Sequence, residues 1–411
     1  MAWTTLTVLR DRNAGLYLGG VLVSGFGDSA MALAAGIWVK TLTDSNSLAA
    51  LVSLCVWLPT LAGPVIGVAA DRVRRRPLLV ATHLVLAALM ATLLLLDSAA
   101  RVWLLFAVLT LVGVGTVLSD AAETALITAA IPDALRGDFN GLVRTAIESM
   151  KLVAPLAGAG LFAALGGPAV AALDAVTFAL AAIAFRSLKV REAPPVARVD
   201  GTWLRDTAEG IRYLKNHPLL RRLILAGAAA MIASSLSSTA TYAMLDVGLH
   251  RAPTLAGVLL ALQGLGSIVS GLAAGALMRR KSEPAYAAAG LALFAAGALA
   301  RATPWLPVVL GGSLLIGLGL VCPLLAALTA LQRATPTDLL GRVAATANTA
   351  MFAPTGLAVL LGAGLVAVVD YRVQLVTAGA LALLAAASLF RSGRSSCRDA
   401  QEHELHGGWT T

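Results

Sequence analysis

Twelve long apolar runs divide this sequence, and most of them are long enough to cross a lipid bilayer as a helix. A spanning helix needs about 20 consecutive apolar residues. The runs are Ala14–Val39, Leu48–Ala69, Leu78–Leu96, Val102–Ala122, Gly141–Leu165, Pro168–Phe185, Leu219–Val247, Leu255–Met278, Ala285–Ala300, Trp305–Leu328, Val343–Val369 and Val373–Phe390. Only 13% of the residues are charged, whereas a soluble domain carries about 25%. We therefore predict an all-α membrane protein with twelve transmembrane helices.

Positive charge is unevenly distributed over the segments between these runs. With an even number of spans, both ends of the chain lie on one side of the membrane. If that side is cytoplasmic, 25 of the 31 Lys and Arg residues lie on inner segments. The outer loops then carry only Lys40, Arg101, Arg251, Arg301 and Arg372. Since Lys and Arg mark the cytoplasmic side, we predict a plasma-membrane protein with cytoplasmic termini. Topology thus accounts for the net charge of +9, and we expect no nucleic-acid partner.

A long polar segment, 186–218, separates the first six runs from the last six. Apolar side chains within Trp203–Leu214 recur at helical spacing, which predicts an amphipathic helix on the membrane surface. The predicted organisation is an N-terminal six-helix half at 1–185, this linker, a C-terminal six-helix half at 219–391 and a cytoplasmic tail at 392–411. The tail is polar, and we expect no regular structure in it.

The sequence contains an internal repeat, because a shift of 204 residues superimposes loop residues in three separate places. The matched pairs are Gly67 with Gly271, Arg75–Arg76 with Arg279–Arg280, Pro132 with Pro336, Gly137 with Gly341, Thr145–Ala146 with Thr349–Ala350, and Gly158 with Gly362. Duplicated six-helix halves are a transporter architecture, in which the substrate binds between the halves near the membrane midplane. The repeat therefore favours a secondary transporter over a receptor or a membrane enzyme.

A densely cationic turn, Gly67–Pro77, lies between the second and third runs. Its candidate functional members are Gly67, Asp71, Arg72, Arg75 and Arg76. This turn resembles the loop between helices 2 and 3 of the major facilitator superfamily. The resemblance implies a cytoplasmic gating motif that stabilises the outward-open state. On the residues alone, the arginines could also serve only to keep this loop on the cytoplasmic side.

Further stretches resemble the drug-exporting branch of that superfamily, which includes macrolide and siderophore efflux proteins. They are Asp11–Tyr17, Ser24–Asp28, Asp174–Phe178 and Gln332–Val343. Pro155 and Gly158 are similar to the Gly-Pro-x-x-Gly antiporter motif of helix 5, with Ala154 in place of its first Gly. The resemblance extends over the whole chain. It implies the major facilitator fold, with two six-helix halves, and exchange of a drug for protons.

The fifth run carries charged residues on one face. Arg144, Glu148 and Lys151 follow one another at intervals of four and three residues, which places them on the same side of a helix together with Pro155 and Gly158. A charge that faces lipid near the membrane centre costs at least about 2–3 kcal/mol. The stripe is therefore expected to face the protein interior or a water-filled cavity.

The fourth helix, which is expected to continue just past the fourth run, adds Asp120 and Glu123, one helical turn apart, toward the same cytoplasmic half of the membrane. Together with Glu148 they make three carboxylates for the two cations of the fifth run. A carboxylate buried without a cationic partner binds a proton more readily. Glu123 and Glu148 are thus candidate proton-coupling residues. The alternative is an ion-pair network that only braces the fourth and fifth helices.

Asp28 and Asp174 are further carboxylates within apolar runs. Ionisable residues at membrane depth are functional candidates by default, so Asp28 is a candidate for proton or cation handling. A structural hydrogen bond to a neighbouring helix is the alternative for Asp28, and hydrogen bonds to backbone groups are the alternative for Asp174. Gln263 and Asn348 could contact substrate or simply bridge helices.

No catalytic machinery is recognisable in the sequence, which has no Walker loop, no His-Glu-x-x-His zinc motif and no Gly-x-Ser-x-Gly elbow. We expect no catalytic residues, no metal and no cofactor. The predicted function is export of small amphipathic compounds by a monomeric proton antiporter. The alternatives are an importer or a lipid flippase with the same fold, or a membrane sensor that transports nothing.

Overall fold

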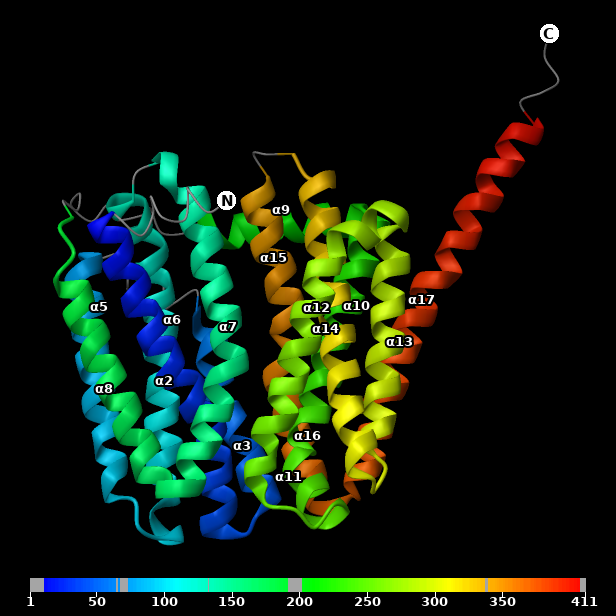
Figure 1. Ribbon diagram of the computed structural model, residues 1–411. Helices are drawn as coiled ribbons and strands as arrows, with labels where there is room; N and C mark the ends of the chain where they lie inside the picture. The colour runs from blue at the N-terminus through cyan, green and yellow to red at the C-terminus, as the bar shows by residue number, and fades with distance from the viewer. Residues whose placement is uncertain are drawn as a thin grey trace. The chain divides into compact units, whose positions relative to one another are not determined.

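The computed structural model (Figure 1) describes residues 11–63, 66, 73–131, 133–190, 202–336 and 339–406. Within these ranges the chain forms helices and no strands. Ten helices are long and apolar enough to cross a membrane, and two shorter apolar helices, Asn46–Thr60 and Leu152–Leu165, accompany them. The predicted all-α membrane architecture is confirmed, and these helices are consistent with twelve spans.

The helices are named as in Figure 1. In chain order they are α2 (Arg12–Thr43), α3 (Asn46–Trp57), η1 (Leu58–Ala62), α5 (Arg75–Thr92), η2 (Leu93–Leu95), η3 (Ala99–Arg101), α6 (Val102–Ala130), α7 (Asp133–Leu165), α8 (Gly167–Arg186), α9 (Thr202–Asn216), α10 (Pro218–Thr239), α11 (Thr241–Ala243), η4 (Met244–Gly248), η5 (Pro253–Leu255), α12 (Ala256–Arg280), α13 (Glu283–Arg301), α14 (Leu306–Ala334), α15 (Leu340–Phe352), α16 (Pro354–Val368) and α17 (Tyr371–His406).

The chain divides into two compact units. Unit 1 comprises Met1–Val199 and Thr241–Ala261, and unit 2 comprises Asp200–Ala240 and Leu262–Thr411. The segment Thr241–Ala261 therefore belongs to unit 1, although in sequence it follows the first helix of the second repeat. The domain boundaries inferred from the sequence, at 185 and 219, stay predictions.

The helices carry the same internal repeat as the loops. α6 and α14 both contain 29 residues, and α14 begins and ends 204 residues after α6. The first residue of α17 likewise lies 204 residues after the first residue of α8. One offset thus relates helices of the two units as well as the loop residues of the sequence.

In unit 1, α2 packs between α7 and α8 (Figure 1). The side chain of Asp11 caps α2 by accepting a hydrogen bond of 2.8 Å from the backbone N–H of Ala14, which satisfies a free donor of the first turn. One turn later, the fully buried ring of Tyr17 makes edge-to-face contacts with Phe139 and Phe185, with ring centroids 5.5 and 5.7 Å apart. The start of α2 is therefore fixed against α7 and α8.

In unit 2, α13 and α14 pack closely through glycines. A Cβ added at Gly297 would lie 2.5 Å from the carbonyl oxygen of Gly312, and one at Gly312 would lie 2.8 Å from the carbonyl oxygen of Gly297. Neither glycine can acquire a side chain without moving the backbone of the other helix. Small residues are commonly used for such close helix contacts in membranes.

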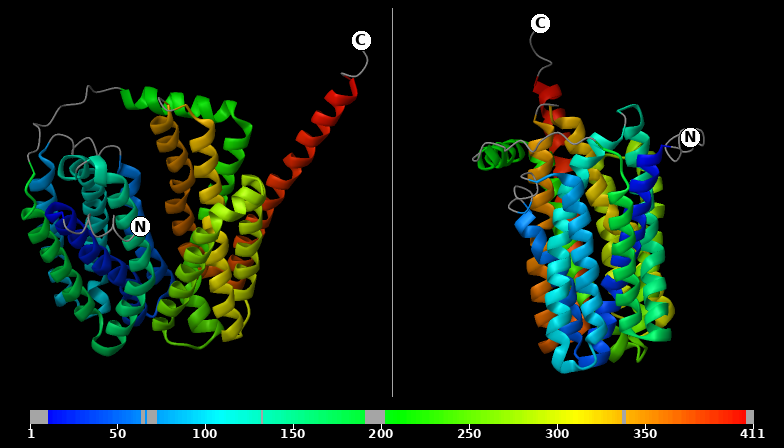
Figure 2. Two further views of the ribbon diagram at one scale, coloured as in Figure 1. Left: turned by 45° about the horizontal axis from the view of Figure 1, so that its top comes forward. Right: turned by 90° about the vertical axis from the view of Figure 1, so that its left-hand side faces the viewer.

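Two segments outside the spans are helical. α9 covers the stretch predicted to be amphipathic, and it lies across the ends of α10 and α15 (Figure 2). α17 continues beyond its apolar part to His406. The expectation that the tail lacks regular structure was therefore wrong for residues 392–406. Extending an existing helix avoids the cost of nucleation, and this stretch contains helix formers such as Arg, Ala, Gln and Glu.

Candidate functional site

Four carboxylates of unit 1 lie close to one another on three membrane-spanning helices. Asp28 is on α2, Asp120 and Glu123 are on α6, and Asp174 is on α8. Asp28 is close enough to Asp120 and Asp174 for their charges to interact, and Glu123 interacts with both Asp120 and Asp28. We call these four residues the carboxylate cluster. The sequence singled out each member, and in the structure Asp28 lies within range of charge interaction with the other three.

Asp174 is the most deeply buried member of the carboxylate cluster, with none of its surface exposed. The hydroxyl of Thr177 lies 3.1 Å from Oδ1 of Asp174 and 2.8 Å from its backbone carbonyl oxygen. Oδ2 of Asp174 has no hydrogen-bond partner among the described atoms. Since a buried acceptor without a donor is costly, this oxygen is available to bind a proton.

Gly27 allows Asp28 to approach Asp174. A Cβ at position 27 would collide with Oγ1 of Thr177 and Oδ1 of Asp174. Only a glycine at this position lets α2 lie so close to α8. The Gly27-Asp28 pair, noticed in the sequence as part of a family resemblance, therefore has a physical role in assembling the carboxylate cluster.

Glu123 is held by a residue to which the sequence assigned no role. The Tyr17 hydroxyl donates a hydrogen bond of 3.2 Å to Oε2 of Glu123. The two residues are separated by 106 positions, so no spacing rule could have paired them. Of the described side chains, neither Glu123 nor Asp28 nor Asp174 forms an ion pair.

The charged stripe of the fifth run lies on α7, whose backbone is helical from Asp133 to Leu165. Arg144, Glu148 and Lys151 therefore follow one another on one face of a regular helix, as their spacing predicts. Their side chains lie outside the described part of the chain. Their contribution to the carboxylate cluster stays a prediction.

Gly158 lets α7 lie directly against α2, while Pro155 faces α12. A Cβ at Gly158 would lie 2.5 Å from the carbonyl oxygen of Ala30 and 2.8 Å from its Cα atom. Ala30 is two residues beyond Asp28. The other side of this stretch contacts α12, since a Cβ at Gly257 would lie 2.8 Å from Cβ of Ala159. The antiporter-like motif thus supports the helix that carries Asp28.

The predicted gating motif is described only in part. Gly67, Asp71 and Arg72 lie outside the described residues, while Arg75 begins α5. Arg76 donates a hydrogen bond from Nη2 to the carbonyl oxygen of Arg186 at the end of α8. This bond satisfies one of the carbonyls that a helix C-terminus leaves free, and it joins the ends of α5 and α8.

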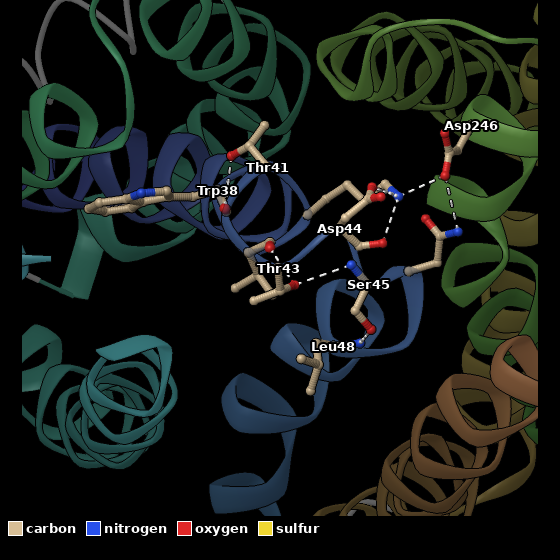
Figure 3. A network of polar contacts seen from close by, with 10 residues as sticks. Trp38, Thr41, Thr43, Asp44, Ser45, Leu48 and Asp246 are labelled. Carbon is tan, nitrogen blue, oxygen red and sulfur yellow. Dashed lines mark hydrogen bonds and ion pairs between the residues drawn. The ribbon is translucent and has the colours of Figure 1, made fainter. Parts of the chain in front are cut away.

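A second polar group, the Lys40 network, lies at the opposite end of α2 (Figure 3). The Lys40 side chain is only 5% exposed, and its Nζ lies 2.8 Å from Oδ1 of Asp44 and 2.7 Å from Oδ2 of Asp246. The side-chain amide of Asn46 lies 3.4 Å from the same oxygen of Asp246. The sequence assigned Lys40 to an outer loop, whereas the structure shows a buried residue in the last turn of α2.

The Lys40 network attaches the segment Thr241–Ala261 to the rest of unit 1. Asp246 lies in the π-helical turn η4. Close to it, the buried Tyr242 places its hydroxyl 3.4 Å from the carbonyl oxygen of Leu33 on α2. Residues from the second repeat are thereby bound to the first helix of the first repeat. No sequence pattern indicated this attachment, because Lys40 and Asp246 are separated by 206 positions.

Comparison with protein families gives a match over most of the chain. A family model described as Major Facilitator Superfamily matches residues 17–359. Macrolide efflux protein A of Streptococcus pyogenes is 25% identical over 193 residues, which make up 46% of this chain and 48% of that protein. The aligned part of the chain therefore spans about half the length of this relative.

Solved structures resemble the whole chain. A bacterial homologue of the iron transporter ferroportin in the inward-facing state gives a TM-score of 0.73 at 17% identity, covering 92% of this chain and 98% of that chain. The POT family transporter PepTSo gives 0.70 at 13% identity, covering 94% and 98%. A bacterial homologue of the human lysosomal transporter Spinster gives 0.69 at 14% identity, covering 95% and 98%. At these identities the likeness is one of fold. Among the described residues, no group of three or more His, Cys, Asp or Glu is arranged to hold a metal ion.

Proposed function

This chain belongs to the Major Facilitator Superfamily, and from that premise we propose that it exports small amphipathic compounds in exchange for protons. It is a membrane transporter and not an enzyme. The similarity to macrolide efflux protein A supports export of a drug or secondary metabolite. The uneven distribution of Lys and Arg supports a plasma-membrane location with cytoplasmic termini.

The carboxylate cluster is the observation that carries the proposal. Antiport needs a group at membrane depth that binds a proton in one state of the transporter and releases it in another. Four neighbouring carboxylates repel one another when ionised, and binding of a proton relieves that repulsion. A cationic or polar substrate group that approaches the carboxylate cluster would have the same effect, so proton and substrate would compete for one site.

The members of the carboxylate cluster differ in how firmly they are held. Glu123 accepts a hydrogen bond from Tyr17, and Asp174 is bound by Thr177. Asp28 has no hydrogen bond to any described residue, yet it interacts with carboxylates on α6 and on α8. We assign proton exchange to Asp28 and Glu123. In this proposal Arg144 and Lys151 of α7 provide counter-charge, and Glu148 is a further candidate for coupling.

Two further groups would control access. We assign the cytoplasmic gating motif to Gly67, Asp71, Arg72, Arg75 and Arg76, as the family resemblance implies. At the outer end, the Lys40 network binds the segment Thr241–Ala261 to α2. Release of this segment in one phase of the cycle, and its reattachment in the next, would couple movement of the second repeat to the first.

The test is substrate accumulation in an efflux-deficient bacterium that expresses this chain, with and without a protonophore. We expect lower accumulation of at least one amphipathic compound, and restoration of accumulation by the protonophore. Asp28→Asn and Glu123→Gln should each reduce proton-driven export by about tenfold or more and leave binding of the same compound measurable. Asp97→Asn is the matched control, because Asp97 is an exposed carboxylate paired with Arg101.

Proteoliposomes then decide the direction and the coupling ion. An imposed proton gradient should drive substrate in the direction opposite to proton flow. Substrate flow in the same direction as protons would indicate uptake, and movement of labelled phospholipid would indicate flipping. Unchanged export by both Asp28→Asn and Glu123→Gln would remove the carboxylate cluster from the mechanism.

A further inference from the structure

Four cations gather where α9 meets α10 in unit 2. α9 ends at Asn216 and α10 begins at Pro218. The exposed basic residues on the two sides of this junction are Arg212, Lys215, Arg221 and Arg222. We call these four residues the basic corner. We propose that the basic corner binds the headgroup of an anionic phospholipid.

The corner has a fixed geometry, because its inner side is tied to unit 2. The ring of Tyr213 stacks on His217, with centroids 4.0 Å apart, and the Tyr213 hydroxyl donates a hydrogen bond of 2.5 Å to the carbonyl oxygen of Ala334. On the preceding turn of α9, Glu209 pairs with Arg342 at 2.6 Å. These contacts fix the end of α9 beside the start of α10, and the four cations lie on these two adjoining helix ends.

The four cations have no structural task within the protein. None of them forms an ion pair or a side-chain hydrogen bond with any residue that the structure describes. Arg221 and Arg222 lie in the first turn of α10, and the helix dipole disfavours positive charge at that end. Topology explains why these residues lie on the cytoplasmic side, but neither capping nor ion pairing explains their place at this junction, so we expect a partner from outside the chain.

Exposed apolar side chains accompany the basic corner. Leu219 and Leu225 lie three residues before and after Arg222, and they are 47% and 61% exposed. On α9, Ile211 is exposed beside Arg212. α10 belongs to a candidate membrane span that starts at Pro218, so the basic corner lies at the depth where apolar chains meet headgroups. Cations next to exposed apolar groups at this depth match a lipid that carries a phosphate above acyl chains.

The experiment titrates the full-length protein in detergent with phosphatidylglycerol and with phosphatidylcholine of the same acyl chains, and follows the midpoint of thermal unfolding. We expect phosphatidylglycerol to raise the midpoint in a saturable manner, and phosphatidylcholine to have little effect. The variant R212Q/K215Q/R221Q/R222Q should need about tenfold more phosphatidylglycerol for half-saturation. Raising the salt concentration should weaken the effect on the wild type, because salt screens exposed charges.

The matched control is R279Q/R280Q/K281Q. These three residues form another exposed basic group of unit 2, at the end of α12, and should respond to phosphatidylglycerol within about twofold of the wild type. R222K, which keeps the charge, should retain most of the response, and the midpoint of thermal unfolding without lipid shows whether each variant is folded. An equal response of the two multiple variants would overturn the proposal. So would reproduction of the wild-type response by inorganic phosphate, because the acyl chains would then contribute nothing.

Discussion

The interiors of the two units differ at positions that the internal repeat relates. The residues 204 positions after the carboxylate cluster are Ile232, Leu324, Ala327 and Ala378. All four are apolar, and Ala327 and Ala378 are fully buried in the core of unit 2. Unit 1 thus has ionisable groups where unit 2 has aliphatic side chains. The duplication explains the shared fold, whereas the carboxylates at these positions are present in one unit only.

Unit 2 uses its interior for close packing instead. The glycine contacts between α13 and α14 bring two backbones together without side chains between them. Neutral hydroxyls join its helices, as when the Tyr286 hydroxyl on α13 donates to the carbonyl oxygen of Ser270 on α12. Under the proposed function, the carboxylates at these related positions would carry protons in unit 1, while the corresponding positions of unit 2 serve packing.

The largest expected effect on stability comes from moving the carboxylate from one unit to the other, by the separate variants Asp174→Ala and Ala378→Asp. Ala378→Asp places a carboxylate in a site with no exposed surface, which we expect to lower the free energy of unfolding by at least about 2 kcal/mol. Asp174→Ala removes a carboxylate whose Oδ2 has no partner among the described atoms, so stability should be unchanged or raised. Thermal unfolding in detergent compares the two variants.

Ala378→Val controls for the added volume, because valine is close to aspartate in size. Asp174→Ala should reduce proton-driven export even though the protein stays folded, because it removes the carboxylate that faces Asp28 in the carboxylate cluster. If Ala378→Asp proved as stable as Ala378→Val, the interior of unit 2 would be as tolerant of charge as that of unit 1. The contrast between the units would then fail.

Replacing Lys40 by Met, the residue at its repeat position 244, should have an intermediate effect. Lys40→Met removes the cation that joins Asp246 to α2, and hydrogen exchange in the segment Thr241–Ala261 should become about fivefold faster, which corresponds to roughly 1 kcal/mol. Hydrogen–deuterium exchange with mass spectrometry measures this directly. Arg101→Met is the control, since it breaks an exposed pair with Asp97 that holds no other segment. Equal protection in both variants would show that the Lys40 network does not hold the segment.

The fold could be predicted from the sequence, because the features that specify it are local patterns along the chain. Apolar runs of spanning length and a constant offset of 204 residues can be read without any knowledge of packing. Within the site, Asp28, Asp120, Glu123 and Asp174 were conspicuous for the same reason, since each is an acidic residue within or directly beside an apolar run. Individual candidate residues could be identified in this way, but the residues that they contact in the folded protein could not.

The pairs that give the site its geometry depend on helix packing. Glu123 meets Tyr17, and Lys40 meets Asp246, across separations of 106 and 206 residues. Lys40 was taken for a loop residue because a lysine near the end of an apolar run is usually exposed. Only the contact between α2 and the segment Thr241–Ala261 buries it. The assignment of that segment to unit 1 is likewise a result of tertiary packing, which no periodicity encodes.

Removing one buried tyrosine hydroxyl from each unit should have the smallest effect on stability. It compares the two units most directly, because the chemical change is the same in both. Tyr17→Phe keeps the ring contacts with Phe139 and Phe185 but deletes the hydrogen bond to Glu123. Tyr286→Phe deletes the hydroxyl that bonds Ser270. Each variant should lose about 1 kcal/mol of stability or less.

Only Tyr17→Phe is expected to change coupling. Because the Tyr17 hydroxyl stabilises the ionised form of Glu123, its loss should let Glu123 hold its proton more tightly, slow proton release and reduce export about twofold to fivefold. Proton and substrate fluxes recorded together in proteoliposomes measure this, and export by Tyr286→Phe should match the wild type once the amounts of folded protein are equal. A similar loss in both variants would mean that the two hydroxyls act only through stability, and that Glu123 is a structural residue like its neutral counterpart in unit 2.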